Sequence, residues 1–329
     1  MQTIRVNGHD MAYLEVGEGP PLLCVHGSLC DFRIWSAVLG PLTQKHRVIA
    51  VSLRHFFPEH WDGVGDTYSI AQHTADVIGF IEKLDTGPVD LMGHSRGGHV
   101  SFRVAQRRPD LLRRLILAEP GGELDATLDP AAKPGPSALA ARIAAAAEKI
   151  AAGDVEGGLT LFFDAIEGAG AWARLPATPK QQLRDNAFTL LGQTRDKRPP
   201  FTKMDAEAIK TPTLFIGGAN TKGALPHVLH TLAAHVPNSK TVMIPGTTHP
   251  MFEQAPQSFA RSCWSSWRGD NPRAVAANAG THAPCPAVLM PAAHNHGTRR
   301  SPGRLAEMQA RPKSIKRCML GLVNPSPRC

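Results

Sequence analysis

A serine lies at the centre of the glycine-bounded segment Gly93-His94-Ser95-Arg96-Gly97. An apolar run precedes this segment and apolar residues at helical spacing follow it, so the sequence predicts a buried strand, a tight turn and a helix. We expect side chains at positions 93 and 97 to collide with the neighbouring strand and helix, which explains the two glycines. Such a turn presents the serine hydroxyl at the end of a sheet, where the helix N-terminus stabilises a developing anion. The pattern therefore indicates a nucleophilic serine.

A serine hydroxyl needs a base within hydrogen-bond reach to act as a nucleophile at neutral pH. His249 is the candidate, because it follows the last predicted strand, residues 241–244, and emerges at the same edge of a parallel sheet as Ser95. His26 also follows a strand, but we expect it to shape its own loop. The other histidines of this part of the chain are expected at the surface or in packing roles.

The elements that must position these residues alternate between apolar strands and helical segments. A hairpin is predicted at the start of the chain, with Asn7-Gly8 as its turn. The predicted strands are 3–6, 11–16, 21–25, 47–52, 88–92, 115–118, 213–216 and 241–244, and a helix is predicted over 69–84. Uncharged strands that alternate with helices predict an α/β fold with a mostly parallel central sheet and helices on both faces. Between 121 and 207 we expect only helices, at 137–152, 159–167 and 181–191.

The net charge of +8 is concentrated near the C-terminus of the 329-residue chain. Residues 262–329 carry ten Lys and Arg against two acidic residues, so the remaining 26 basic and 26 acidic groups of residues 1–261 balance. A neutral body argues against nucleic-acid or membrane binding. We expect the Pro- and Arg-rich tail, 269–329, to be disordered. It is interpreted either as an out-of-frame translation or as a genuine basic extension.

Cysteine usage and hydropathy bear on the compartment of the protein. Four of the six cysteines lie in residues 262–329, and only Cys24 and Cys30 lie in residues 1–261, which suits a reducing compartment. The chain has no apolar stretch long enough to span a membrane and no secretory signal at its start. We therefore expect a cytoplasmic protein.

Three motifs together resemble the α/β-hydrolase superfamily. They are Gly93–Gly98, His26-Gly27-Ser28, and the ending that runs from Pro245-Gly246 through His249 and Glu253 to Pro256. The resemblance covers about residues 1–265 and includes esterase and meta-cleavage-product hydrolase members. It implies a core in two parts, 1–120 and 208–268, a helical cap at 121–207, and serine chemistry that needs neither metal nor organic cofactor.

The acid of the triad departs from the usual pattern of that superfamily. The acid commonly follows the strand that corresponds to 213–216, but this chain has Gly218-Ala219-Asn220-Thr221 there. Some members place the acid at the end of the preceding strand, where this chain has Glu119. A carboxylate at the end of an apolar strand is costly to bury without a partner, which favours a bond to the catalytic histidine. The alternatives are an ion pair of Glu119 with Arg113 or Arg114, Asp125 as the acid, or a triad without an acid.

The resemblance also implies an oxyanion hole built from backbone N–H groups. One N–H belongs to Arg96, the residue after the nucleophile, and the other to Ser28, with Leu29 as the alternative donor. Leu29 and His94 are also candidates for the substrate pocket. The segment 54–61 replaces a loop common in the family, and its aromatic residues either line the acyl pocket or pack under the cap. These residues are Phe56, Phe57 and Trp61.

The function that these residues predict is hydrolysis of small-molecule carboxylic esters through an acyl-enzyme. Cleavage of a carbon–carbon bond in a ring-cleavage diketone, or of a lactone, is the alternative within enzymes. A serine in the turn argues against dehalogenase and epoxide hydrolase chemistry, for which similar enzymes use an aspartate there. The other classes considered are a ligand-binding module with a vestigial turn and a binder of nucleic acid or membrane through the basic tail. The sequence leaves the oligomeric state open.

Overall fold

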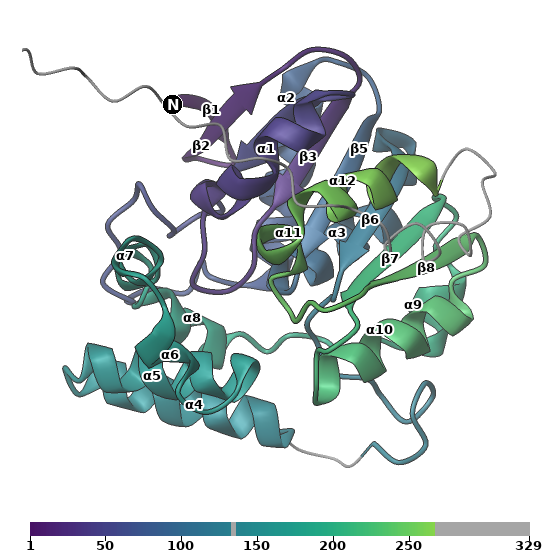
Figure 1. Ribbon diagram of the computed structural model, residues 1–329. Coiled ribbons are helices and arrows are strands. Elements are labelled where there is room, and N and C mark those ends of the chain that lie inside the picture. The colour runs from purple at the N-terminus through teal and green to yellow at the C-terminus, as the bar shows by residue number, and fades with distance from the viewer. Residues whose placement is uncertain (133–135, 267–329) are drawn as a thin grey trace, which may run out of the picture. The chain divides into compact units, whose positions relative to one another are not determined.

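The computed structural model describes residues 1–132 and 136–266. Its centre is an eight-stranded sheet in the order β1-β2-β4-β3-β5-β6-β7-β8 (Figure 1). The interpretations of the tail, 269–329, lie outside the described residues. The strands are β1 Gln2–Val6, β2 His9–Val16, β3 Pro21–Val25, β4 Arg47–Val51, β5 Val89–His94, β6 Leu112–Ala118, β7 Thr213–Gly218 and β8 Ser239–Ile244.

Only the first two strands depart from parallel pairing. β1 pairs antiparallel with β2, and β2 pairs antiparallel with β4, whereas all later neighbours are parallel. The predicted hairpin turn is present, with Asn7 at φ 46° and Gly8 at φ 77°. Because a positive φ is easiest for glycine and asparagine, the Asn-Gly pair fixes this turn. The α/β fold class predicted from the alternation of elements is confirmed.

Helices cover both faces of the sheet and meet two separate apolar clusters. Successive residues of β3 point to opposite faces, so Leu22 and Cys24 belong to one cluster and Leu23 and Val25 to the other. One face packs against the helices α1 Ser36–Thr43, α11 Met251–Gln254 and α12 Pro256–Ser265, with the short 3-10 helix η1 Phe32–Trp35. The other packs against α2 Ile70–Leu84, α3 Arg96–Arg107, α9 Lys203–Glu207 and α10 Ala224–His235; the 3-10 helix η2 Pro109–Leu111 precedes β6. This arrangement brings the carboxyl ends of β5, β6 and β8 to one edge.

Five helices are inserted between β6 and α9, and we call them the inserted helices (Figure 1). They are α4 Ala138–Ala151, α5 Val155–Glu167, α6 Ala171–Arg174, α7 Ala177–Asp185 and α8 Thr189–Arg195, and they share an apolar cluster of their own. The prediction of a single helix over 181–191 is wrong, because the helical structure is interrupted at Asn186, between α7 and α8. The Asn186 side chain accepts a hydrogen bond from the backbone N–H of Phe57 at 2.7 Å and donates to Asp31 at 2.8 Å. These partners are distant in sequence, so local pattern could not reveal the break.

Within the described residues, none of the helices combines the length and the apolar character required to cross a membrane.

Candidate active site

Ser95 occupies a strained turn between β5 and α3. Its backbone lies at φ 52° and ψ −117°, a conformation that non-glycine residues rarely adopt. Hydrogen bonds on both sides hold it there: its N–H donates to the carbonyl of Ala118 at 3.0 Å, and its carbonyl accepts from the N–H of Gly121 at 2.9 Å and of His99 at 3.2 Å. The side chain of Ser95 lines a cavity at the carboxyl ends of the strands.

The glycines around Ser95 are required by close packing. A Cβ at Gly93 would lie 2.2 Å from the carbonyl oxygen of Gly97 in α3, and a Cβ at Gly97 would lie 2.3 Å from the carbonyl oxygen of Val25 in β3. Both distances are far shorter than any contact that a real Cβ makes. The predicted collisions with helix and strand are therefore confirmed.

A buried carboxylate and a histidine meet beside this turn. Glu119, at the end of β6, is fully buried, and its Oε2 accepts a hydrogen bond of 2.6 Å from Nδ1 of His249. Its Oε1 accepts a second bond, of 2.9 Å, from the backbone N–H of Gly218 in the neighbouring strand. The alternative pairing with Arg113 does not occur, because Arg113 forms an ion pair of 2.9 Å with Asp90. With Nδ1 donating to Glu119, Nε2 of His249 is left as an acceptor.

His94 lies between the turn and His249. Its ring centroid is 4.3 Å from that of His249, and Phe252 packs edge-on against it at 4.8 Å. Burial, followed by the neighbouring His249, holds the pKa of His94 well below its usual range. His94 therefore adds no positive charge next to His249 at neutral pH.

The loop after β3 passes directly beside Ser95. A Cβ at Gly27 would lie 3.0 Å from Nδ1 of His94 and 3.1 Å from Cβ of Ser95, so an added side chain would require these neighbours to shift. His26 shapes this loop: Nδ1 lies 2.8 Å from the carbonyl of Gly27 and Nε2 accepts from the N–H of Leu53 at 3.0 Å. Burial lowers the pKa of His26 to about 4, so the ring is neutral. Ser28 and Leu29, which follow, both line the cavity.

The cavity above Ser95 has a volume of about 450 Å³. One side of the cavity is formed by residues of the core, which include Ser28, Leu29, His94, Ser95 and His249. The inserted helices contribute the opposite side through Phe162, Phe163, Ile166, Glu167, Ala171, Arg174, Leu175, Pro176, Pro179, Gln182 and Leu183. Most of this second set is apolar, which suits an uncharged organic substituent.

Two carboxyl groups on the cavity wall were not foreseen. Glu167 accepts a hydrogen bond of 2.8 Å from the hydroxyl of Thr248, and burial raises the pKa of Glu167 above its usual range. Desolvation, with the charge of Glu167 as a second cause, raises the pKa of Glu253 to about 7. Glu253 belongs to the ending that carried the family resemblance, but nothing in its sequence context indicates that it lines the same cavity as Glu167.

The aromatic segment 54–61 packs away from the cavity. Phe56 is buried with its ring 4.6 Å from that of His26, Phe57 lies under the guanidinium of Arg33 at 3.6 Å, and Trp61 stacks on His55 at 4.2 Å. None of the three aromatic side chains is among the residues that line the cavity. Of the two interpretations, lining the pocket or packing under the inserted helices, the second describes the structure: the N–H of Phe57 donates to Asn186, and Trp61 lies next to Gly192.

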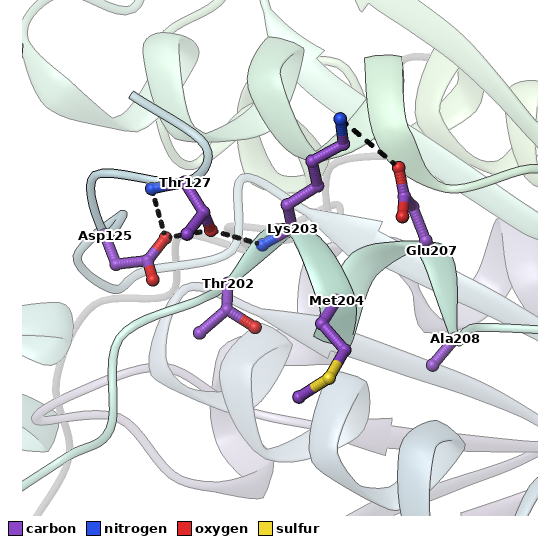
Figure 2. Close-up of a pocket in the computed structure, with 7 residues that line it drawn as sticks. All are labelled: Asp125, Thr127, Thr202, Lys203, Met204, Glu207 and Ala208. Atoms are coloured by element: carbon purple, nitrogen blue, oxygen red, sulfur yellow. Dashed lines mark hydrogen bonds and ion pairs between the residues drawn. The ribbon is translucent and has the colours of Figure 1, made fainter. Parts of the chain in front are cut away.

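A second hollow, of about 710 Å³, lies at the surface, and Ser95, His249 and Glu119 are not among the residues that line it (Figure 2). Its lining includes Asp125, which accepts hydrogen bonds from the N–H and hydroxyl of Thr127, and the ion pair of Lys203 with Glu207. Asp125, the alternative acid, therefore contacts Thr127 rather than His249. Among the described residues, no cluster of three His, Cys, Asp or Glu side chains is placed to hold a metal ion.

A mostly parallel sheet that carries a serine in a strand–turn–helix and a histidine bonded to a buried carboxylate is the architecture of α/β-type hydrolases. The sequence pattern of the alpha/beta hydrolase family matches residues 22–262. The chain therefore belongs to the alpha/beta hydrolase family.

Individual proteins are similar to this chain over part or most of its length. A 2-hydroxy-6-oxo-2,4-heptadienoate hydrolase of Pseudomonas putida is 35% identical over 118 residues, which is 35% of this chain and 40% of that protein. Across the known relatives considered, the matched segments span 35% to 44% of their own lengths. The fold is similar to that of the enol-lactonase from Burkholderia xenovorans, with a TM-score of 0.62, 20% identity and coverage of 79% of this chain and 97% of that one. It is also similar to a thermophilic esterase from Thermogutta terrifontis, with a TM-score of 0.61, 24% identity and coverage of 81% and 96%.

Proposed function

We propose that the protein is a serine hydrolase that cleaves small-molecule carboxylic esters through a triad of Ser95, His249 and Glu119. The observation that carries the proposal is the 2.6 Å hydrogen bond between the buried Glu119 and His249 at the cavity that Ser95 lines. A buried carboxylate fixes the imidazole tautomer and stabilises the cation that forms during the reaction. Such an arrangement is the one that activates a serine hydroxyl.

The reaction follows from these positions. Oγ of Ser95 attacks the ester carbonyl, its proton passes to Nε2 of His249, and the imidazolium is stabilised by Glu119. The backbone N–H groups of Ser28 and Arg96 hold the oxyanion. His249 then protonates the leaving alkoxide, which leaves an acyl-enzyme on Ser95. Water, deprotonated by His249, attacks this ester and releases the acid and the free serine.

The cavity supports an ester with an uncharged acyl group, and we assign the inserted helices the role of a cap over it. The wall that faces Ser95 from these helices is mainly apolar and includes Phe162, Phe163 and Ile166. Glu167 and Glu253 face the same space. A substrate with its own carboxylate would bring a third acidic group into this space, which like-charge repulsion disfavours.

Turnover of p-nitrophenyl esters from acetate to decanoate tests the proposal. We expect hydrolysis by the wild-type protein and a loss of about 10⁴-fold or more in kcat for Ser95→Ala. Ser101→Ala is the matched control, because Ser101 is buried in α3, the helix that follows Ser95, and does not line the cavity. Equal turnover by Ser95→Ala and the wild type would overturn the proposal, as would the absence of turnover by a folded wild-type protein.

Carbon–carbon bond hydrolysis is a second candidate. The match to a heptadienoate hydrolase favours it, and Arg174 on the cavity wall supplies a cation that could pair with a substrate carboxylate. Formation of a product acid from a ring-cleavage dienoate, without turnover of any ester in the series, would favour this candidate over the esterase.

A further inference from the structure

Helix α8 belongs to the inserted helices but takes no part in lining the cavity. Among the described residues, α5, α6 and α7 all contribute to the lining, whereas no residue of 189–196 does. Gln193 of α8 and Asp196, which directly follows the helix, contact the core instead. The position of α8 therefore calls for a role other than contact with substrate.

One of these contacts reaches the loop after β3. The hydroxyl of Ser28 donates a hydrogen bond of 2.6 Å to Oε1 of Gln193, near the end of α8. The next residue in the loop, Leu29, has a φ of 59°. A bulky residue holds a positive φ only when its surroundings restrain it. Gln193 is one of these restraints on the Ser28–Leu29 backbone.

The other contact reaches the first residue of α3. Nη2 of Arg96 donates a hydrogen bond of 2.9 Å to Oδ2 of Asp196, directly after α8, and the two side chains are only 1% and 5% exposed. The same carboxylate oxygen accepts from the backbone N–H of Ile70 at the start of α2, at 3.0 Å. The guanidinium also lies over the ring of Tyr68, 4.5 Å from its centroid. Because an unpaired buried charge is strongly unfavourable, this pair locks Arg96 to α8.

We propose that the C-terminal end of α8 positions the oxyanion hole, Gln193 through Ser28 and Asp196 through Arg96. The inference rests on the proposed function, because Ser28 and Arg96 are the residues assigned there as N–H donors. Oxyanion stabilisation requires donors that are already aimed before charge develops. The two donors come from the loop after β3 and from the first residue of α3, and the end of α8 contacts the side chains of both through Gln193 and the adjoining Asp196.

The arrangement also separates two tasks within the inserted helices. The turn before α8 is tied to the core through Asn186, which bonds both Asp31 and Phe57. Helix α8 is thus held at both ends, whereas α5, α6 and α7 form the wall of the cavity. Substrate entry through movement of α8 would disturb the oxyanion hole, so entry on the α5–α7 side follows from the proposal.

The test compares Gln193→Ala, Ser28→Ala and the double variant in ester hydrolysis and in inhibition by butylboronic acid. The boron of this inhibitor bonds to Oγ of Ser95, the serine proton passes to His249, and the tetrahedral anion occupies the oxyanion hole. We expect each single variant to lose about tenfold in kcat and in boronate affinity with KM unchanged, since a whole donor contributes about 10²–10³-fold. The double variant should lose no more than either single variant, because both remove the same bond.

Thr194→Ala is the matched control, since Thr194 lies in the same turn and its exposed hydroxyl bonds only the carbonyl of Leu191. It should retain wild-type kcat and boronate affinity. Asp196→Asn, which keeps an acceptor but removes the charge, should also lower kcat and boronate affinity with KM unchanged, and its thermal unfolding temperature is recorded beside that of Gln193→Ala.

A folded Gln193→Ala with wild-type kcat and boronate affinity would overturn the positioning role, as would a rise in KM alone. Additive losses in the double variant would overturn it too. If the wild-type protein itself neither bound the boronate nor hydrolysed esters, the proposed function would fail, and the positioning role with it. A wild-type protein that does both, beside an unaffected Gln193→Ala, isolates failure of the positioning role alone.

Discussion

Glu119 in the core and Glu253 on the cavity wall are the same residue type in opposite surroundings. Glu119 is fully buried, yet its two oxygens accept bonds from Gly218 and His249. Glu253 faces the cavity near another carboxyl group, Glu167, and its pKa rises to about 7. Two donors thus compensate the burial of Glu119, whereas partial desolvation and the neighbouring charge of Glu167 raise the pKa of Glu253, which lies at the exposed surface of the cavity wall.

The same contrast holds for the regions around them. The core edge that carries Ser95 is over-determined, with strained backbone held by hydrogen bonds and glycines that admit no side chain. The wall built by α5, α6 and α7 consists mainly of apolar side chains. Apolar side chains make no hydrogen bonds, so the shape of this side of the cavity depends on their size and packing. We infer that the core edge specifies the reaction and the wall specifies the substrate. Substitutions in the two regions should therefore have different signatures.

The largest effect is expected for Glu119→Gln in the core. Gln cannot stabilise the imidazolium of His249, so kcat should fall about 10³–10⁴-fold, with KM nearly unchanged. Steady-state kinetics on p-nitrophenyl butyrate measures both. Glu123→Gln, a nearby glutamate that bonds Ser137 and does not line the cavity, is the control. A loss below tenfold in Glu119→Gln would remove Glu119 from the proposed triad.

The next largest effect is expected for Gly97→Ala, which should lower the stability of the fold. The new Cβ would meet the Val25 carbonyl at 2.3 Å, and neither backbone can move away. We expect the free energy of unfolding to fall by about 3 kcal/mol, at the upper end for overpacking. Gly40→Ala, in the exposed interior of α1 with no atom within 4 Å of the added Cβ, should instead stabilise by about 0.5–1 kcal/mol. Urea unfolding of both variants tests the contrast, and equal stabilities would contradict the tight packing at Gly97.

Phe163→Ala should change substrate choice while leaving the chemistry intact. Removing this ring enlarges the wall side of the cavity, so the ratio of kcat/KM for decanoate over butyrate should rise about tenfold. Phe188→Ala is the control, because Phe188 is 39% exposed on the same group of helices and lies outside the lining. A uniform fall with both esters would mean that Phe163 supports the core edge and not the wall alone.

The smallest effect is expected for Glu253→Gln and depends on pH. With its pKa near 7, Glu253 is mostly neutral at pH 6 and mostly charged at pH 8. An anionic ester such as p-nitrophenyl hemisuccinate should therefore gain up to about fivefold in kcat/KM from the substitution at pH 8, and almost nothing at pH 6. The ratio to neutral butyrate at each pH cancels the pH effects that both esters share. A gain of equal size at both pH values would contradict the raised pKa.

The local sequence pattern predicted the strands and helices whose apolar residues recur at the spacing of a strand or of a helix. The strands around Ser95, the Asn7-Gly8 turn and the amphipathic helix α2 follow from apolar spacing and turn chemistry. The break between α7 and α8 escaped prediction, because the bonds of Asn186 to Asp31 and Phe57 join segments more than 120 residues apart. No local pattern encodes such a bond.

Residue types and chain order nominated Ser95 and His249, because parallel strands bring their carboxyl ends to one edge. The resemblance to the α/β-hydrolase superfamily added Glu119 as the acid. The sequence could not show that Glu119 lies 2.6 Å from His249 and that Asp125 instead bonds Thr127, since both distances depend on how neighbouring strands and loops pack. The influence of Glu167 on the pKa of Glu253 and the hydrogen bonds that Gln193 and Asp196 make to the core also depend on how distant segments pack. Short sequence motifs contain the candidate catalytic residues. The cavity and the residues that position the oxyanion hole form only when distant segments pack together.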